Sequence, residues 1–156
     1  MARVALVTGG MGGLGEAVCF KLAALGYRVV TTFSPGNTKV DSWLASTKEM
    51  GYDFKAYECD VADYDSAQAC VAKIEQEVGP IDVLVNNAGI TRDTTMKRMD
   101  HQKWQDVIDT NLGGCFNMAK AVFEGMQGRS YGRIVNTSSI TAFDGDLRRF
   151  GYLDFT

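Results

Sequence analysis

The chain has 156 residues, of which 46% are hydrophobic and 22% are charged, values that are typical of one globular domain with a substantial core. Its formal net charge of −3 argues against a nucleic-acid-binding surface. No apolar run approaches the roughly 20 residues of a membrane-spanning helix. We therefore expect neither a nucleic-acid partner nor a membrane partner.

The first predicted strand, residues 4–7, leads directly into a glycine-rich turn and then a helix over about residues 13–25. The strand lacks polar alternation, as expected for a parallel strand that is covered on both faces. Glycine allows a pyrophosphate to approach the backbone, and the first helical turn offers unpaired N–H groups to an anion. An ordinary glycine-rich turn is the alternative. The spacing Thr-Gly-x-x-x-Gly-x-Gly, which predicts a dinucleotide site, is carried by Thr8, Gly9, Gly13 and Gly15.

The second predicted strand, residues 28–33, ends without the carboxylate that would accept hydrogen bonds from the 2′-hydroxyl of NAD. The first acid after it is Asp41. An acid at the strand end would repel a 2′-phosphate, so its absence favours NADP(H) over NAD(H). A polar loop without a binding role is the alternative. The hydrogen-bond donors and the one positive charge of this turn come from Ser34, Asn37, Thr38 and Lys39.

Strands and helices continue to alternate along the chain, which predicts an α/β fold with a doubly wound, Rossmann-like parallel sheet and a ligand at the carboxyl ends of the strands. Residues 1–140 form this domain, and residues 141–156 form a divergent tail. The long helix carries a broad apolar stripe, which favours core packing and, as a second use, a homo-oligomer face. The remaining elements are expected as helices over about 40–50, 66–78 and 102–126 and strands over about 54–59, 81–85 and 133–137.

Two of the predicted strands end in polar residues. The carboxylate of Asp60 can accept a hydrogen bond from an adenine amino group, or it can mark a helix start, as we expect for Asp63. After the next strand, small residues and amides stand where the backbone must pass close to a cofactor, in the sequence Asn86-Asn87-Ala88-Gly89.

The cysteines and the single histidine predict no metal site. The four cysteines lack metal-ligand spacing, so we expect reduced thiols in a cytoplasmic protein. The first strand follows Met1 almost directly, and we expect no signal peptide. His101 has no partner pattern, which favours a surface or helix-start position.

Together these motifs resemble the short-chain dehydrogenase/reductase family, from residue 2 to about Ile140. Within the family the sequence is most similar to NADPH-dependent acetoacetyl-CoA reductases of polyhydroxybutyrate synthesis, with 3-oxoacyl-(acyl carrier protein) reductases next. Each motif alone is weak, but the combination is specific. Besides the glycine turn, the motifs are Asp60-Val61, Asn86-Asn87-Ala88-Gly89, Asn111 and Asn136-Thr137-Ser138-Ser139.

The resemblance implies a role for each matching residue. The pyrophosphate is expected at Gly9, Gly12, Gly13, Leu14 and Gly15, the 2′-phosphate at Ser34 and Lys39, and the adenine at Asp60 and Val61. The ribose and nicotinamide side is expected at Asn87, Ala88, Gly89 and Thr91, with Asp93 near the substrate mouth. For catalysis, Asn111 is expected to interrupt the long helix and position a water, Ser139 to bind the ketone oxygen, and a later tyrosine to donate the proton.

The tail departs from the family pattern. Tyr152 stands thirteen residues after Ser139, where the catalytic tyrosine belongs, but Thr156 occupies the place of the lysine that binds ribose and lowers the tyrosine pKa. Tyr152 is therefore either the catalytic acid or a tyrosine of an unrelated tail. We interpret the sequence as a truncated or frame-shifted reductase, in which the strand at 133–137 becomes an exposed edge.

The function that the resemblance implies is hydride transfer from NADPH to a 3-ketoacyl thioester, foremost acetoacetyl-CoA, which yields the 3-hydroxy product. The alternatives are a 3-oxoacyl-(acyl carrier protein) reductase and a non-catalytic nucleotide-binding fragment. The full-length family implies a homotetramer.

Overall fold

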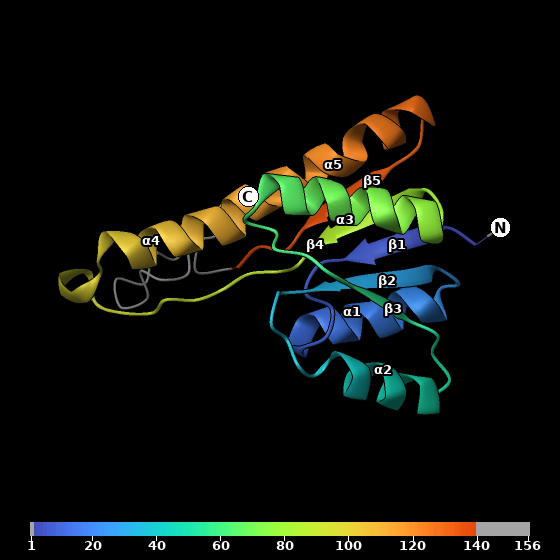
Figure 1. The fold of residues 1–156 in the computed structure, drawn as a ribbon, viewed down its shortest axis with the longest axis horizontal. Coiled ribbons are helices and arrows are strands. Elements are labelled where there is room, and N and C mark those ends of the chain that lie inside the picture. The colour runs from blue at the N-terminus through green and yellow to red at the C-terminus, as the bar shows by residue number, and fades with distance from the viewer. Residues whose placement is uncertain (1, 140–156) are drawn as a thin grey trace.

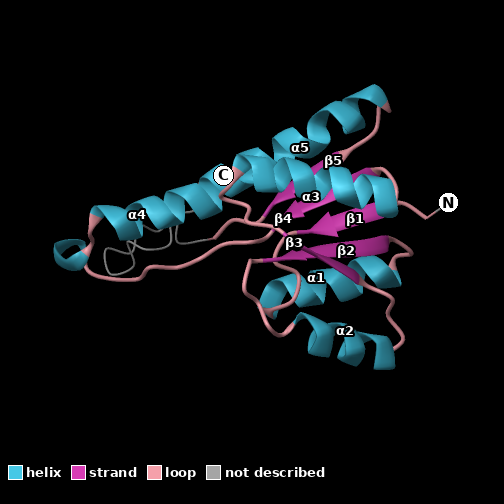
Figure 2. Ribbon diagram, viewed as in Figure 1, coloured by secondary structure: helices cyan, strands magenta, loops and turns pink. Residues whose placement is uncertain are grey.

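The computed structural model of the chain describes residues 2–139. Its described part contains a five-stranded parallel sheet in the order β3-β2-β1-β4-β5 (Figure 2). The order reverses between β1 and β4, so the sheet is doubly wound as predicted, and a crevice is expected at that point. The strands are β1 (Val4–Val7), β2 (Arg28–Phe33), β3 (Lys55–Glu58), β4 (Ile81–Asn86) and β5 (Arg133–Asn136).

Helices cover both faces of the sheet (Figure 1). One face carries α1 (Gly13–Ala24) and α2 (Val40–Glu49), and the opposite face carries α3 (Tyr64–Glu77) and α5 (Gly114–Gly128). Between β4 and α5, the chain extends beyond the sheet through a short 3-10 turn, η1 (Met96–Arg98), and α4 (His101–Val107). No helix within residues 2–139 is long and apolar enough to cross a membrane.

The core has two halves because successive side chains of β1 point to opposite faces of the sheet. Val4 and Leu6 pack on the side of α3 and α5, in a cluster that includes Ile74 and Met118. Ala5 and Val7 pack on the side of α1 and α2. A fully buried strand explains the absence of polar alternation in residues 4–7.

The long helix expected over residues 102–126 is interrupted. A π-helical segment, η2 (Ile108–Gly113), separates α4 from α5 and contains Asn111, which the resemblance expects at an interruption. A π-helical turn is a rare irregularity that is frequent at functional sites. The helix boundary thus coincides with a candidate site residue.

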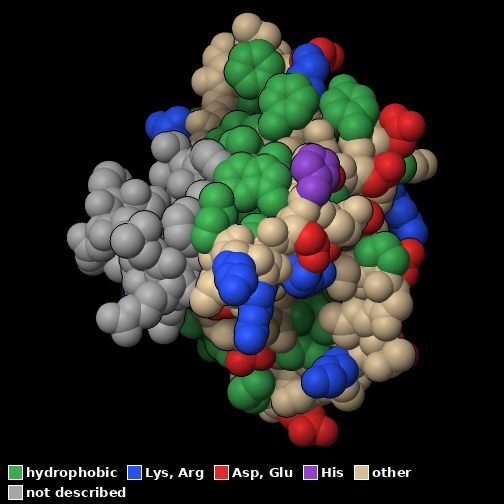
Figure 3. Space-filling view, turned by 90° about the vertical axis from the view of Figure 1, so that its left-hand side faces the viewer, with side chains coloured by type: hydrophobic (Ala, Val, Ile, Leu, Met, Phe, Trp, Pro, Cys, Tyr) green, Lys and Arg blue, Asp and Glu red, His purple; other side chains and the backbone are tan. Residues whose placement is uncertain are grey.

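Only part of the apolar stripe that runs along α4 and α5 is buried in the core. Met118 and Val122 are buried, but Phe116 is 63% exposed and Phe123, two turns further on, is 50% exposed. The end view shows hydrophobic side chains gathered around the single histidine, His101, at the start of α4 (Figure 3). Strand β5 lies at the sheet edge with all its residues exposed, as expected.

Candidate functional site

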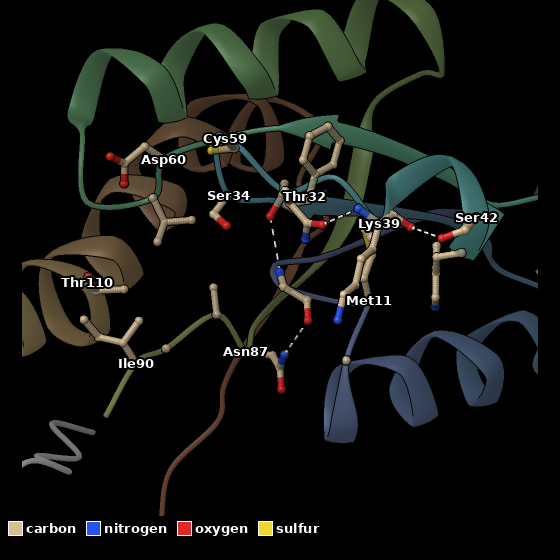
Figure 4. A pocket seen from close by; sticks show the side chains of 18 residues that line it. Met11, Thr32, Ser34, Lys39, Ser42, Cys59, Asp60, Asn87, Ile90 and Thr110 are labelled. Carbon is tan, nitrogen blue, oxygen red and sulfur yellow. Dashed lines mark hydrogen bonds between the residues drawn. The ribbon is translucent and has the colours of Figure 1, made fainter. Parts of the chain in front are cut away.

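A cavity of about 750 Å³ opens at the carboxyl ends of the strands beside the point where the strand order reverses (Figure 4). This is where a doubly wound sheet is expected to bind its ligand. The walls come from the turns after β1, β2, β3 and β4 and from the starts of α2 and η2. The lining residues are Gly9, Met11, Gly12, Thr32, Phe33, Ser34, Asn37, Lys39, Ser42, Trp43, Cys59, Asp60, Val61, Asn87, Ala88, Gly89, Ile90 and Thr110.

The side chain of Thr8 joins the ends of β1 and β4 at the base of this cavity. Its hydroxyl oxygen accepts hydrogen bonds from the backbone N–H of Asn87 at 2.9 Å and of Ala88 at 3.0 Å. The Asn87 side-chain amide donates in return to the carbonyls of Thr8 at 3.0 Å and Gly9 at 3.2 Å. Thr8 is buried, so these bonds fix the two strand ends against each other.

Two buried threonines of β2 hold the glycine turn from the other side. Thr31 accepts from the N–H of Gly10 at 2.8 Å and donates to the carbonyl of Val7 at 2.9 Å. Thr32 accepts from the N–H of Gly9 at 3.3 Å, a contact that Figure 4 shows. The turn is therefore held by side chains from both sides, Thr31 and Thr32 of β2 and Asn87 after β4.

The N-terminus of α1 faces open space. Its N-cap residue, Gly12, makes no side-chain capping bond, so the first N–H groups of the helix lack that partner. A Cβ atom built at Gly12 or at Gly13 would meet nothing within 4 Å. Uncapped amides, a positive dipole end and open space are the features that a phosphate group requires.

Glycine is required at other positions of the same turn. Gly9 has a φ of +63° and Gly13 a φ of +49°, which L side chains rarely adopt. A Cβ at Gly15 would lie 2.5 Å from the carbonyl oxygen of Gly9 and 2.6 Å from Nδ2 of Asn87. Gly15 thus allows α1 to pack against the turn, whereas the space beside Gly12 stays open.

The outer wall of the cavity belongs to the turn after β2 and to α2. Lys39 donates its N–H to Oδ1 of Asn37 at 2.9 Å, and the Ser42 hydroxyl donates to the Lys39 carbonyl at 2.9 Å. Trp43 is held by a 2.6 Å hydrogen bond from its indole N–H to Glu16 of α1. Polar groups and one ammonium group therefore gather where the sequence leads us to expect a 2′-phosphate.

The turn after β3 forms the opposite wall. The Asp60 carboxylate accepts from the N–H of Ala62 at 3.0 Å, and Asp63 is the N-cap of α3, as predicted, accepting from Ser66 at 2.6 Å. From α5, the amide of Asn117 donates to the carbonyls of Val61 and Ala62 at 2.9 and 3.2 Å. This wall is held by a helix that is distant in sequence.

Asn111 holds the segment after β4 with both ends of its side-chain amide. Its oxygen accepts from the N–H of Ile90 at 2.8 Å, and its nitrogen donates to the carbonyl of Ile90 at 3.1 Å. A Cβ at Gly89 would lie 3.2 Å from the Asn111 oxygen, so the small residue permits this approach. The π-helical turn thus positions the wall formed by Ala88, Gly89 and Ile90.

The structure brings together most, but not all, of the expected site residues. Gly13, Leu14, Gly15 and Thr91 do not line the cavity, although the first three form the start of α1 beside it. Asp93 is exposed and Ser139 is half-buried, and neither lines the cavity. Tyr152 and the tail at 141–156 lie outside the described residues.

Several wall and support residues are missing from the sequence prediction. The clearest signal for them is in β2, where Thr31 and Thr32 are polar residues that follow two buried valines. The others depend on how distant elements pack, and no local pattern marks them. The missed residues are Met11, Thr31, Thr32, Phe33, Ser42, Trp43, Cys59, Ile90, Thr110 and Asn117.

The sequence is similar to that of known proteins. Residues 3–152 match the family described as short chain dehydrogenase, a range that extends into the segment treated above as a divergent tail. The chain is 47% identical over 150 residues to an acetoacetyl-CoA reductase of Cupriavidus necator and 52% identical over 140 residues to one of Paracoccus denitrificans. It is 38% identical over 153 residues to a 3-oxoacyl-[acyl-carrier-protein] reductase of Staphylococcus aureus.

These alignments cover 96%, 90% and 98% of this chain but only 61%, 56% and 62% of the three relatives. The chain thus spans about three fifths of their length. Among solved structures, it resembles an actinorhodin polyketide ketoreductase variant with NADPH, with a TM-score of 0.90 and 34% identity. That match covers 97% of this chain and 58% of the ketoreductase.

Two glycine substitutions test whether Gly15 is needed for packing whereas Gly12 borders open space. Gly15→Ala forces the new Cβ against backbone and is expected to lower the free energy of unfolding by about 1–3 kcal/mol. Gly12→Ala places its Cβ in open space and is expected to lower stability by less than about 1 kcal/mol. Urea unfolding followed by circular dichroism measures both. Equal stability losses in the two variants would contradict this assignment.

Proposed function

The chain belongs to the short-chain dehydrogenase family, and on that premise we propose that its cavity binds NADP(H) for the reduction of a 3-ketoacyl thioester, foremost acetoacetyl-CoA. One observation carries the nucleotide part of the proposal. The glycine turn is held from both sides by Thr8, Thr31 and Thr32 while the space beside Gly12 remains open. The identity to acetoacetyl-CoA reductases supports the substrate part.

The preference for NADP(H) over NAD(H) rests on the charges of the outer wall. Among the described residues that line the cavity, Lys39 carries the positive charge and Asp60 the negative charge, on opposite walls. An ammonium group beside Ser34, Asn37 and Ser42 suits a 2′-phosphate, and no carboxylate of the β2 turn opposes it. Asp60 and Val61 are left to contact the adenine.

The remaining residues are assigned by their place along the cavity. The start of α1, with Gly12, Gly13 and Leu14, would hold the pyrophosphate by its N–H groups. Asn87, Ala88 and Gly89 would orient the ribose and nicotinamide, with Thr91 beyond them. The bound cofactor supplies the hydride.

The protein's own groups would guide the proton and the substrate. We assign Ser139 to the ketone oxygen, Tyr152 to proton donation, and Asp93 to the mouth of the substrate site. Asn111 fixes Ile90 through its side chain, and in the proposed relay it positions a water as well.

Two further functions have specific support. Identity to the Staphylococcus aureus reductase favours an acyl-carrier-protein substrate as the second candidate. Thr156, in place of a lysine, favours a nucleotide-binding chain without turnover.

The exposed Phe116 and Phe123 on α5 suit contact with another copy of the chain, in line with a homo-oligomer.

Binding affinities for NADPH and NADH test the cofactor assignment. We expect NADPH to bind more tightly than NADH, and Lys39→Ala to weaken NADPH binding about tenfold, or about 1.4 kcal/mol, without changing NADH binding. Isothermal titration calorimetry measures both affinities. Lys48→Ala is the matched control, since Lys39 is the N-cap residue of α2 whereas Lys48 lies in the last turn of that helix and does not line the cavity. Equal loss in both variants, or equal affinity of the wild-type chain for the two cofactors, would refute the assignment.

Turnover tests the catalytic assignment. We expect acetoacetyl-CoA to support NADPH oxidation, and Tyr152→Phe to reduce the rate by about 10²–10⁴-fold through loss of the proton donor. Tyr64→Phe, at the exposed start of α3, serves as the control. Faster reaction with an acetoacetyl acyl carrier protein favours the second candidate. NADPH binding without oxidation of either substrate favours the non-catalytic function.

A further inference from the structure

A hydrogen bond between side chains joins α1 to α2, the two helices on one face of the sheet. The indole N–H of Trp43, in the first turn of α2, donates to Oε2 of Glu16 at 2.6 Å. Glu16 lies in the first turn of α1 and directly follows Gly15 of the glycine turn. The bond therefore connects the turn that is proposed to hold the pyrophosphate with the wall that is proposed to hold the 2′-phosphate.

The ring of Trp43 is also fixed by packing. It stacks on Phe54 with a centroid distance of 5.6 Å and an interplanar angle of 15°. Phe54 belongs to the core cluster on this side of the sheet, and Trp43 packs against that cluster. Because Trp43 and Glu16 are both half-buried, water competes less for their charge-assisted hydrogen bond than it does at a fully exposed pair.

The first turn of α2 connects this anchored ring to Lys39. The backbone N–H of Trp43 donates to the Lys39 carbonyl at 3.0 Å, and the Ser42 hydroxyl donates to the same carbonyl at 2.9 Å. The N–H of Lys39 donates to Oδ1 of Asn37 at 2.9 Å. All four residues line the cavity. The backbone position from which the Lys39 ammonium group extends is therefore fixed to α1 through Trp43.

We propose that Trp43 and Glu16 are positioning residues for the preference of NADPH over NADH, an inference that rests on the proposed nucleotide site. NADPH has two anionic parts, the pyrophosphate and the 2′-phosphate, and NADH lacks the second. The bond between Trp43 and Glu16 fixes the distance between the glycine turn, which would take the pyrophosphate, and Lys39, which would take the 2′-phosphate. An ammonium group that is already in place loses less conformational freedom when a phosphate binds.

A released Glu16 carboxylate would act on both cofactors alike. Without its indole partner, this charge in the first turn of α1 would repel a pyrophosphate, which NADPH and NADH share. A change in the position of Lys39 would affect only the 2′-phosphate, which NADH does not have. The ratio of the NADPH affinity to the NADH affinity therefore separates positioning from repulsion.

Calorimetric titration of Trp43→Phe with NADPH and with NADH tests the proposal. Phenylalanine keeps a ring against Phe54 but has no N–H to donate to Glu16. We expect the ratio of the two affinities to fall about fivefold relative to the wild-type chain. Trp104→Phe is the matched control, since Trp104 lies on α4, is 39% exposed and does not line the cavity.

Two substitutions of Glu16 test the same bond from α1. Glu16→Ala removes the acceptor and introduces a good helix former, so we expect the affinity ratio to fall as it does in Trp43→Phe. Glu16→Gln keeps an oxygen that can accept from the indole N–H, so we expect the ratio to stay within about twofold of the wild-type value. Circular dichroism is expected to show the same helical content in every variant.

The Lys39→Ala background tests whether the bond acts through Lys39. Once the ammonium group is absent, its position has no effect, so adding Trp43→Phe is expected to leave the affinity ratio of Lys39→Ala unchanged. A purely structural role of Trp43 would lower the ratio by the same factor with and without Lys39.

The outcomes distinguish this proposal from the cofactor assignment. An unchanged affinity ratio in Trp43→Phe and Glu16→Ala, an equal fall with and without Lys39, or an equal fall in Trp104→Phe overturns the positioning role and leaves the cofactor assignment intact. Equal affinity of the wild-type chain for NADPH and NADH overturns the cofactor assignment, and the positioning role falls with it.

Discussion

The hydroxyl group of Thr8 is the contact on which the candidate site depends. It lies at the reversal of strand order, where β1 and β4 diverge into their following turns, and it accepts a hydrogen bond from each of the first two amides after β4. Asn87 completes the link by donating to the carbonyls of Thr8 and Gly9. Because Thr8 is 1% exposed, water cannot replace these partners. The glycine turn after β1 and the segment after β4 are thus held as one unit.

The fold could be predicted from the sequence because its signals are local. The run of buried residues in β1, the glycines after it and the repeated strand–helix units each act over one element, and the elements lie within a few residues of their predicted bounds. The exposure of Phe116 and Phe123 on α5 could not be predicted, because an apolar stripe does not specify which of its members finds a partner. Their exposure depends on what packs against the helix, and periodicity carries no information on that.

The parts of the site that a single turn forms could be predicted from the sequence. The parts where distant elements meet could not. The glycine turn, Asp60 and the segment from Asn87 to Gly89 are continuous stretches at strand ends, so their place at the cavity follows from a parallel sheet. Trp43 and Asn117 come from helices whose approach to the site is set by packing, and no local spacing marks either residue.

Calorimetric titration of a Thr8→Val variant with NADP+ tests most directly whether the strand-end link creates the nucleotide site. Valine keeps the shape of the side chain but leaves the two amides after β4 without their acceptor, while Thr8→Ser keeps the hydroxyl and is the matched control. We expect Thr8→Val to retain its helical and strand content by circular dichroism and to bind NADP+ at least about tenfold more weakly than the wild-type chain, with Thr8→Ser close to wild type. Equal NADP+ affinity of Thr8→Val and the wild-type chain would contradict the account.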